Sequence, residues 1–147
     1  MIKTFRGNIP AGAIDTVVLH TNNGETGYRI VTFQLMLPNS AANIKSSIKI
    51  YKTPQTTVTD DVDFSDNTLL AAGMISAKAD QTAYPEDMTV FFDKEIFNQD
   101  IYLTHQDEQS AGLGINYYIE LEQVKLDLSE STIATLKDIR NIKTQGF

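Results

Sequence analysis

Cysteine and tryptophan are both missing from this chain of 147 residues. Without cysteine the protein forms no disulfide, has no thiolate nucleophile and offers no thiolate to a metal, so its folding is expected to be independent of redox state. No apolar run approaches the ~20 residues that a membrane-spanning helix needs. The first seven residues lack the basic-then-apolar order of a signal peptide. The sequence therefore predicts no membrane partner and no secretion by that route.

Basic residues are also few. The chain has 12 Lys and Arg against 19 Asp and Glu, which gives a formal net charge of −7. Nonspecific binding to nucleic acid or to anionic membranes requires clustered Lys and Arg. The densest basic stretches contain Lys45, Lys49 and Lys52, and Lys137, Arg140 and Lys143. We interpret both as solvated side chains on strand and helix faces, and we predict no nucleic-acid partner.

An alternation of apolar and polar residues with a period of two dominates the chain and indicates β-strands. Turn-forming residues separate the alternating runs, and strands are predicted near 2–7, 15–21, 28–37, 47–52, 68–77, 86–93, 99–105 and 114–127. Eight short strands with no helix between them predict an all-β fold, an antiparallel β-sandwich or jelly roll. In the run 28–37 we expect Val31, Phe33 and Leu35 to share the face that forms the core.

Two details concern how the strands are arranged. Asn22-Asn23-Gly24 lies between strand 15–21 and strand 28–37 and favours a hairpin turn, so these two strands are predicted to pair antiparallel. In the last strand the apolar face changes near Glu122-Gln123, and a one-residue slip turns every later side chain over. We expect a β-bulge or bend there. The alternative is that the second half serves another core or a partner chain.

Only the C-terminal residues have a helical pattern. Asp127 and Glu130 fit an acidic capping pattern, and a narrow apolar stripe would follow at Ile133, Leu136 and Ile139. The Thr and Ile content also allows an extended arm. We therefore expect a single domain, with a β-sandwich at 1–128 and a C-terminal helix or arm at 129–147. The segments Met1–Pro10 and Ser129–Phe147 are candidate arms that reach neighbouring subunits.

Motifs for catalysis and cofactors are absent from the sequence: no nucleophile elbow, Walker A loop, His-Glu-x-x-His or dinucleotide fingerprint is found. His20 and His105 fall near the ends of predicted strands, and we interpret them as hydrogen-bonded or solvated. We predict that the protein is not an enzyme. We assign no catalytic, cofactor-binding or metal-binding residue and no cofactor.

The most acidic stretch contains Asp60, Asp61, Asp63, Asp66 and Asn67. Clustered carboxylates in a loop could hold Ca²⁺, but the EF-hand pattern fails because Asp66 stands where its glycine belongs and Ala72 where its final Glu belongs. We favour an acidic surface loop in which Phe64 is anchored in the core and Asp66 and Asn67 form Asx turns.

Four aromatic residues fall on predicted outer faces: Tyr51, Phe91, Tyr102 and Tyr118. Such rings contact sugars in carbohydrate-binding sandwiches, or they are covered by a neighbouring subunit. Because they occur on several strands, we favour a protein interface.

Several segments spread over nearly the whole chain carry a resemblance: Met1–Gly7, Gly27–Val31, Ile50–Thr53, Val62–Asp66, Glu95–Ile101, Asn116–Glu122 and Leu136–Arg140. In these the sequence resembles small virion structural proteins of tailed, marine-type bacteriophages. The resemblance implies a non-enzymatic virion protein, assembled in the host cytoplasm, with other virion proteins and its own copies as partners. We expect a capsid cement or decoration protein. A tail or head–tail component and a glycan- or receptor-binding module are the alternatives.

Overall fold

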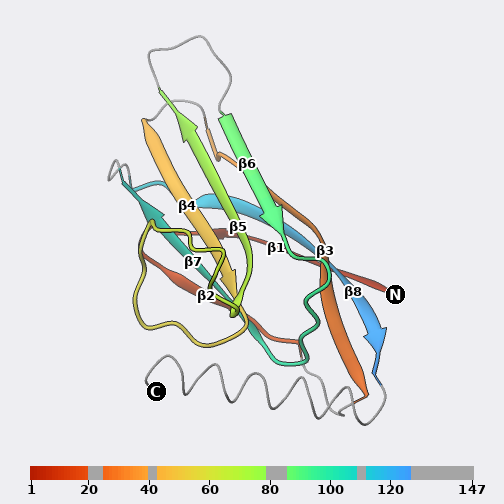
Figure 1. Ribbon diagram of the computed structural model, residues 1–147. Helices are drawn as coiled ribbons and strands as arrows, with labels where there is room; N and C mark the ends of the chain where they lie inside the picture. Colours follow the sequence, from red (N-terminus) through yellow and green to blue (C-terminus); the bar gives the residue numbers. More distant parts are fainter. Residues whose placement is uncertain (20–24, 40–42, 79–85, 109–111, 127–147) are drawn as a thin grey trace.

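The structure of the protein is a computed structural model that describes residues 1–19, 25–39, 43–78, 86–108 and 112–126. These residues form eight β-strands and no helix (Figure 1). The strands are β1 (Ile2–Ile9), β2 (Ile14–Val17), β3 (Thr26–Met36), β4 (Ile44–Tyr51), β5 (Leu69–Ala77), β6 (Glu86–Phe91), β7 (Ile101–Asp107) and β8 (Ile115–Lys125). Each of the eight lies where the alternation predicts one, with ends shifted by a few residues.

The strands form two antiparallel sheets that pack as a sandwich, which confirms the predicted fold class. One sheet has three strands in the order β1-β8-β3, and the other has five in the order β2-β7-β4-β5-β6. Inward side chains from both sheets meet in one hydrophobic core. At its centre Gly73 of β5 lacks a side chain, and a Cβ there would lie 2.6 Å from Leu35 Cδ1 of the opposite sheet. Glycine therefore allows the two sheets to approach closely at this point.

The predicted hairpin between β2 and β3 is wrong. β2 pairs with β7 in the five-stranded sheet, whereas β3 pairs with β8 in the three-stranded sheet. The amide of Leu19, just after β2, donates to Asp100 Oδ1 at 3.0 Å and keeps this end beside the start of β7. A turn signal concerns local φ angles only, and here the chain crosses from one sheet to the other. Residues 20–24, with His20, lie outside the described residues.

The bulge lies in β3 and not in β8. The pairing of β3 with β8 shifts between Ile30 and Thr32, while β8 pairs without interruption from Leu121 to Lys125. Val31 is thus the extra residue, and the buried face consists of Tyr28 and Ile30 before the bulge, and Phe33 and Leu35 after it. The expectation that Val31 shares the core face is wrong, because a bulge changes the alternation within the strand.

Of the two candidate arms, Met1–Pro10 lies in the described residues. It is not a free arm, because β1 pairs with β8 along its whole length, from Ile2 opposite Glu122 to Ile9 opposite Ile115. Residues 127–147, which include the predicted helix or arm at 129–147, lie outside the described residues. In the described part of the chain, no helix is long and apolar enough to cross a membrane.

Candidate interaction surface

The outer face of the three-stranded sheet carries polar side chains that form an ion pair and hydrogen bonds with one another. Arg29 Nη2 forms an ion pair with Glu122 Oε2 at 2.6 Å. Glu120 accepts two hydrogen bonds, from Thr32 Oγ1 at 3.0 Å and from Tyr118 Oη at 2.6 Å. The bond to Glu120 raises the pKa of Tyr118, since it favours the protonated phenol. Beside this network is an open hollow of about 490 Å³, lined by Arg6, Gln34, Met36, Asn116 and Tyr118 among others.

The outer face of the five-stranded sheet is partly covered by the acidic loop, which we define as residues 52–68 between β4 and β5 (Figure 1). Lys49 of β4 is only 3% exposed beneath it. Its ammonium donates to the carbonyl oxygen of Asp61 at 2.6 Å and to Thr59 Oγ1 at 3.1 Å. Burial lowers the pKa of Lys49, and the neighbouring Asp61, Asp60 and Asp66 oppose that shift. Lys49 therefore holds the loop on the sheet.

Inside the acidic loop, two carboxylates bind backbone and hydroxyl groups of their own segment. Asp63 Oδ1 accepts the amide of Ser65 at 2.9 Å and its hydroxyl at 2.6 Å, and these bonds lower the pKa of Asp63. Asp66 Oδ1 accepts the amide and hydroxyl of Thr68 at 2.9 and 2.7 Å. The predicted Asx turn at Asp66 is confirmed, and a second one is centred on Asp63. Among the described residues, no group of three His, Asp or Glu side chains is arranged to hold a metal ion.

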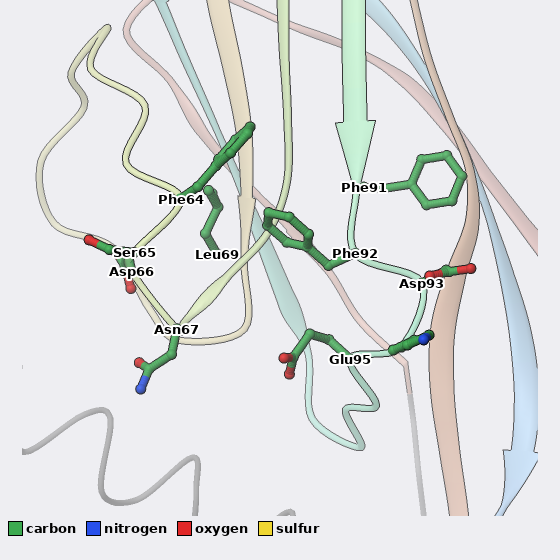
Figure 2. Close-up of a pocket in the computed structure, with 10 residues that line it drawn as sticks. Phe64, Ser65, Asp66, Asn67, Leu69, Phe91, Phe92, Asp93 and Glu95 are labelled. Atoms are coloured by element: carbon green, nitrogen blue, oxygen red, sulfur yellow. The ribbon is translucent and has the colours of Figure 1, made fainter.

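The sequence predicted that Phe64 is anchored in the core, but this prediction is wrong, because Phe64 is 56% exposed. The turn closed by the Asp66 amide and the Asp63 carbonyl (3.2 Å) places Phe64 at its outer corner. Its ring packs edge to face on Phe92, with 5.4 Å between centroids. Figure 2 shows Phe64 and Phe92 pointing toward one another, while Phe91 points to the other side. The two rings border a hollow of about 410 Å³.

These rings continue into exposed apolar side chains on the outer face of β5 and β6. Met74 and Met88 are directly opposite each other, and they are 49% and 70% exposed. Val90, two residues along β6, is 36% exposed. We define the methionine strip as Phe64, Met74, Met88, Val90 and Phe92. Grouped apolar side chains on an edge strand are typical of a protein interface, and methionine adapts to varied partner surfaces.

The predicted outward aromatics are only partly confirmed. The prediction that Phe91 faces outward is wrong, because Phe91 packs against the core while Met88 and Val90 face outward. Tyr51 and Tyr102 are cross-strand partners on the outer face of the five-stranded sheet, and each is half-buried. Burial, assisted by Asp66 and Asp63, raises the pKa of Tyr51 to about 12. Tyr118 lies on the other sheet, so these rings do not form a single aromatic platform.

His105 of β7 has a structural role. It is fully buried, with Nδ1 2.9 Å from the carbonyl oxygen of Ile9 and Nε2 2.8 Å from Ser46 Oγ. A carbonyl only accepts, so Nδ1 carries a proton and donates it to the Ile9 oxygen. The prediction of a hydrogen-bonded histidine is confirmed for His105. Its ring connects β7 to β4 within one sheet and to β1 of the other.

Comparison with known proteins identifies no relative. No protein family matches the sequence, and no curated protein is similar to it. The resemblance to phage virion proteins therefore stays a prediction, and the candidate surface is defined by its geometry alone.

Proposed function

We propose that the protein is a non-enzymatic structural protein of a tailed-phage virion, and that it acts as capsid cement or decoration by binding the shell through protein–protein contacts. The observation that carries this proposal is the methionine strip, in which exposed Met88 and Val90 lie on the edge strand β6, exposed Met74 lies on the neighbouring β5, and exposed Phe64 lies in the acidic loop. The resemblance in the sequence supports the virion as its location.

The strip suits an interface that is small in each copy and repeated many times. Complete burial of a fully exposed side chain of this size contributes roughly 1.5–3 kcal/mol, and the gain is smaller for Met88 and Val90, which are 70% and 36% exposed. Association also has a large entropic cost, so one such patch gives weak binding on its own. Many copies on one shell add their contributions, because each bound copy stabilises the state that it binds.

The location is tested by mass spectrometry of purified particles of the source phage, followed by cryo-electron microscopy of the same particles. We expect this chain in the particles and density for an eight-stranded sandwich on the outside of the capsid. Density in the tail or at the head–tail junction would replace the cement role by one of the two alternatives. Absence of the chain from the particles would refute a virion protein.

The surface is tested by a matched pair of variants. Phe64→Lys should abolish co-sedimentation of the purified protein with particles that lack it, because a lysine in the strip would be buried without a partner. Met36→Lys is the control, because Met36 is 69% exposed against 56% for Phe64 but lies on the other sheet. Equal binding by both variants would show that the strip is not the contact.

A second candidate function is glycan binding at the hollow beside Tyr118. Arg6, Tyr118 and Gln34 are cross-strand neighbours in one row, and together they offer a ring with planar hydrogen-bonding groups on both sides. Titration with host-surface glycans, followed by tyrosine fluorescence, tests this function. Binding that Tyr118→Ala removes would favour it, and an unchanged signal would count against it.

A further inference from the structure

A groove of about 660 Å³ lies over the outer face of β4, β5 and β6, where β5 ends and β6 begins (Figure 1). Met74 and Met88 of the methionine strip line it, together with Ser47. Its charged lining residues are Asp60, Asp61, Asp87, Glu108 and Lys45. Four carboxylates and one ammonium give a net charge of 1 − 4 = −3. Lys45 lies 3.1 Å from Glu108, so its charge is already engaged.

The acidic wall of this groove is held in place by a specific contact. The buried ammonium of Lys49 binds the backbone carbonyl of Asp61 and not its carboxylate. The side chains of Asp60 and Asp61 therefore stay exposed at the groove while their backbone is fixed to the sheet. An apolar floor with a fixed acidic wall is complementary to a segment that alternates basic and apolar side chains.

The chain itself contains one such segment outside the described residues. In residues 136–143 the basic side chains are Lys137, Arg140 and Lys143, and the apolar ones are Leu136, Ile139 and Ile142. Asp138 is the single acidic residue, so the segment has a net charge of 3 − 1 = +2. Its charge and apolar content match those of the groove.

The place where the described chain ends favours a neighbouring copy as the source of this segment. The amide of Leu126 donates to the carbonyl of Glu25 at 2.6 Å, at the end of the sandwich where β8 stops and β3 begins. The strand ends that line the groove lie at the opposite end of the sandwich (Figure 1). The ten residues from Leu126 to Leu136 span at most roughly 35 Å when extended, which reaches a subunit packed against this end of the sandwich.

We infer that the acidic groove of one copy binds residues 136–143 of a second copy. This inference rests on the proposed function, since it supplies the contact between copies that a virion protein present in many copies needs. Met74 and Met88 serve this contact, and Phe64, Val90 and Phe92 are left for the shell. The contact is electrostatic around an apolar centre, so it weakens as the salt concentration rises.

The test uses the full chain and sedimentation velocity over a wide range of protein and salt concentrations. The wild type should associate, and more strongly at low salt. A groove variant with Asp60→Lys and Asp61→Lys should be monomeric, and so should an arm variant with Lys137→Glu and Arg140→Glu. A mixture of the two variants should associate again, because each wild-type element then meets a complementary partner. Circular dichroism should be that of the wild type in both variants, and the melting temperature of the groove variant should be lower, because Asp60 and Asp61 offset the burial of Lys49.

A single Asp60→Lys variant should also weaken association, and Asp93→Lys is its control, because Asp93 is an exposed acid outside the groove. It should leave association unchanged. A wild type that is monomeric at every concentration would overturn the inference, and so would association that the variants do not alter or a mixture that stays monomeric. The proposed function fails separately, through absence of the chain from particles. A monomeric chain that is present in virions would refute only the inference.

Discussion

The outer faces of the two sheets differ in how their polar and apolar groups are satisfied. On the three-stranded sheet, Glu120 and Glu122 accept bonds from Tyr118, Thr32 and Arg29, so the face is stable in contact with water. On the five-stranded sheet, one part is covered by the acidic loop and the rest exposes the methionine strip. A face whose polar side chains already bind one another gains little free energy from a partner protein. This difference supports the proposal that protein contacts lie on the second face.

The largest effect on stability is expected on the covered face. Lys49→Ala should lower the free energy of unfolding by about 1–3 kcal/mol, because it removes two hydrogen bonds and leaves the Asp61 carbonyl without its donor. The loop should also detach, so that chymotrypsin cleaves after Phe64 faster than in the wild type. Denaturant titration and timed proteolysis measure the two effects. Lys94→Ala, at an exposed lysine, is the control, and equal behaviour of both variants would contradict the role of Lys49.

On the polar face, Glu120→Ala should cost about 1 kcal/mol of unfolding free energy, since two donors lose their acceptor. The pKa of Tyr118 should also fall toward its ordinary value, because the bond that raises it is gone. Tyrosine resonances followed through an alkaline pH titration measure the second effect. An unchanged Tyr118 titration would mean that Glu120 does not hold the phenol in solution.

A smaller coupling is expected between Arg29 and Glu122. A double-mutant cycle with Arg29→Ala and Glu122→Ala should give about 0.2–1 kcal/mol, the range for exposed ion pairs. The side chains are 36% and 39% exposed, so added salt should reduce the coupling. Denaturant unfolding at low and high salt measures it. A coupling that salt does not change would indicate that contacts other than charge hold this pair.

At neutral pH the smallest effect is that of Tyr51, which contributes a pH-dependent change only in alkaline solution. Because burial raises the pKa of Tyr51 from 10.0 to about 12, the folded protein keeps this proton at pH values where the unfolded chain loses it. The stability from this group is full below pH 10.0 and is lost as the pH rises to about 12. Tyr51→Phe should therefore lose less unfolding free energy than the wild type across this range. An equal loss in both proteins would contradict the shift.

The strands could be predicted from the sequence because alternation is a local property of neighbouring residues. Their partners could not. β2 and β3 are close in sequence, yet they lie in different sheets, and β1 finds its partner in β8 at the other end of the described chain. The bulge at Val31 could not be predicted either. Ile30, Val31 and Phe33 are all apolar, so the alternation alone does not show which of them face the core.

The candidate surface was harder to predict for the same reason. In β6, Met88 and Val90 alternate with Thr89, which favoured Met88 and Val90 as the inward face, but Phe91 packs against the core and Met88 and Val90 face outward. The acidic loop was recognised from its composition, but Lys49 was not connected to it. The strand pattern predicted a solvated Lys49, but Lys49 is buried because residues 59 and 61 of the acidic loop lie over it.

The position of β8 between β1 and β3 has a consequence for the order of folding. Every strand pairing of the three-stranded sheet involves β8, the last strand in the described residues, so β1 and β3 have no strand partner before β8 is made, apart from the single bridge between Tyr28 and Phe97. During synthesis, the three-stranded sheet cannot form before β8 is made, whereas all strands of the five-stranded sheet are already available. Such long-range pairing is slow and leaves strand edges exposed. The ribosome-bound chain should therefore depend on chaperones until its last strand emerges.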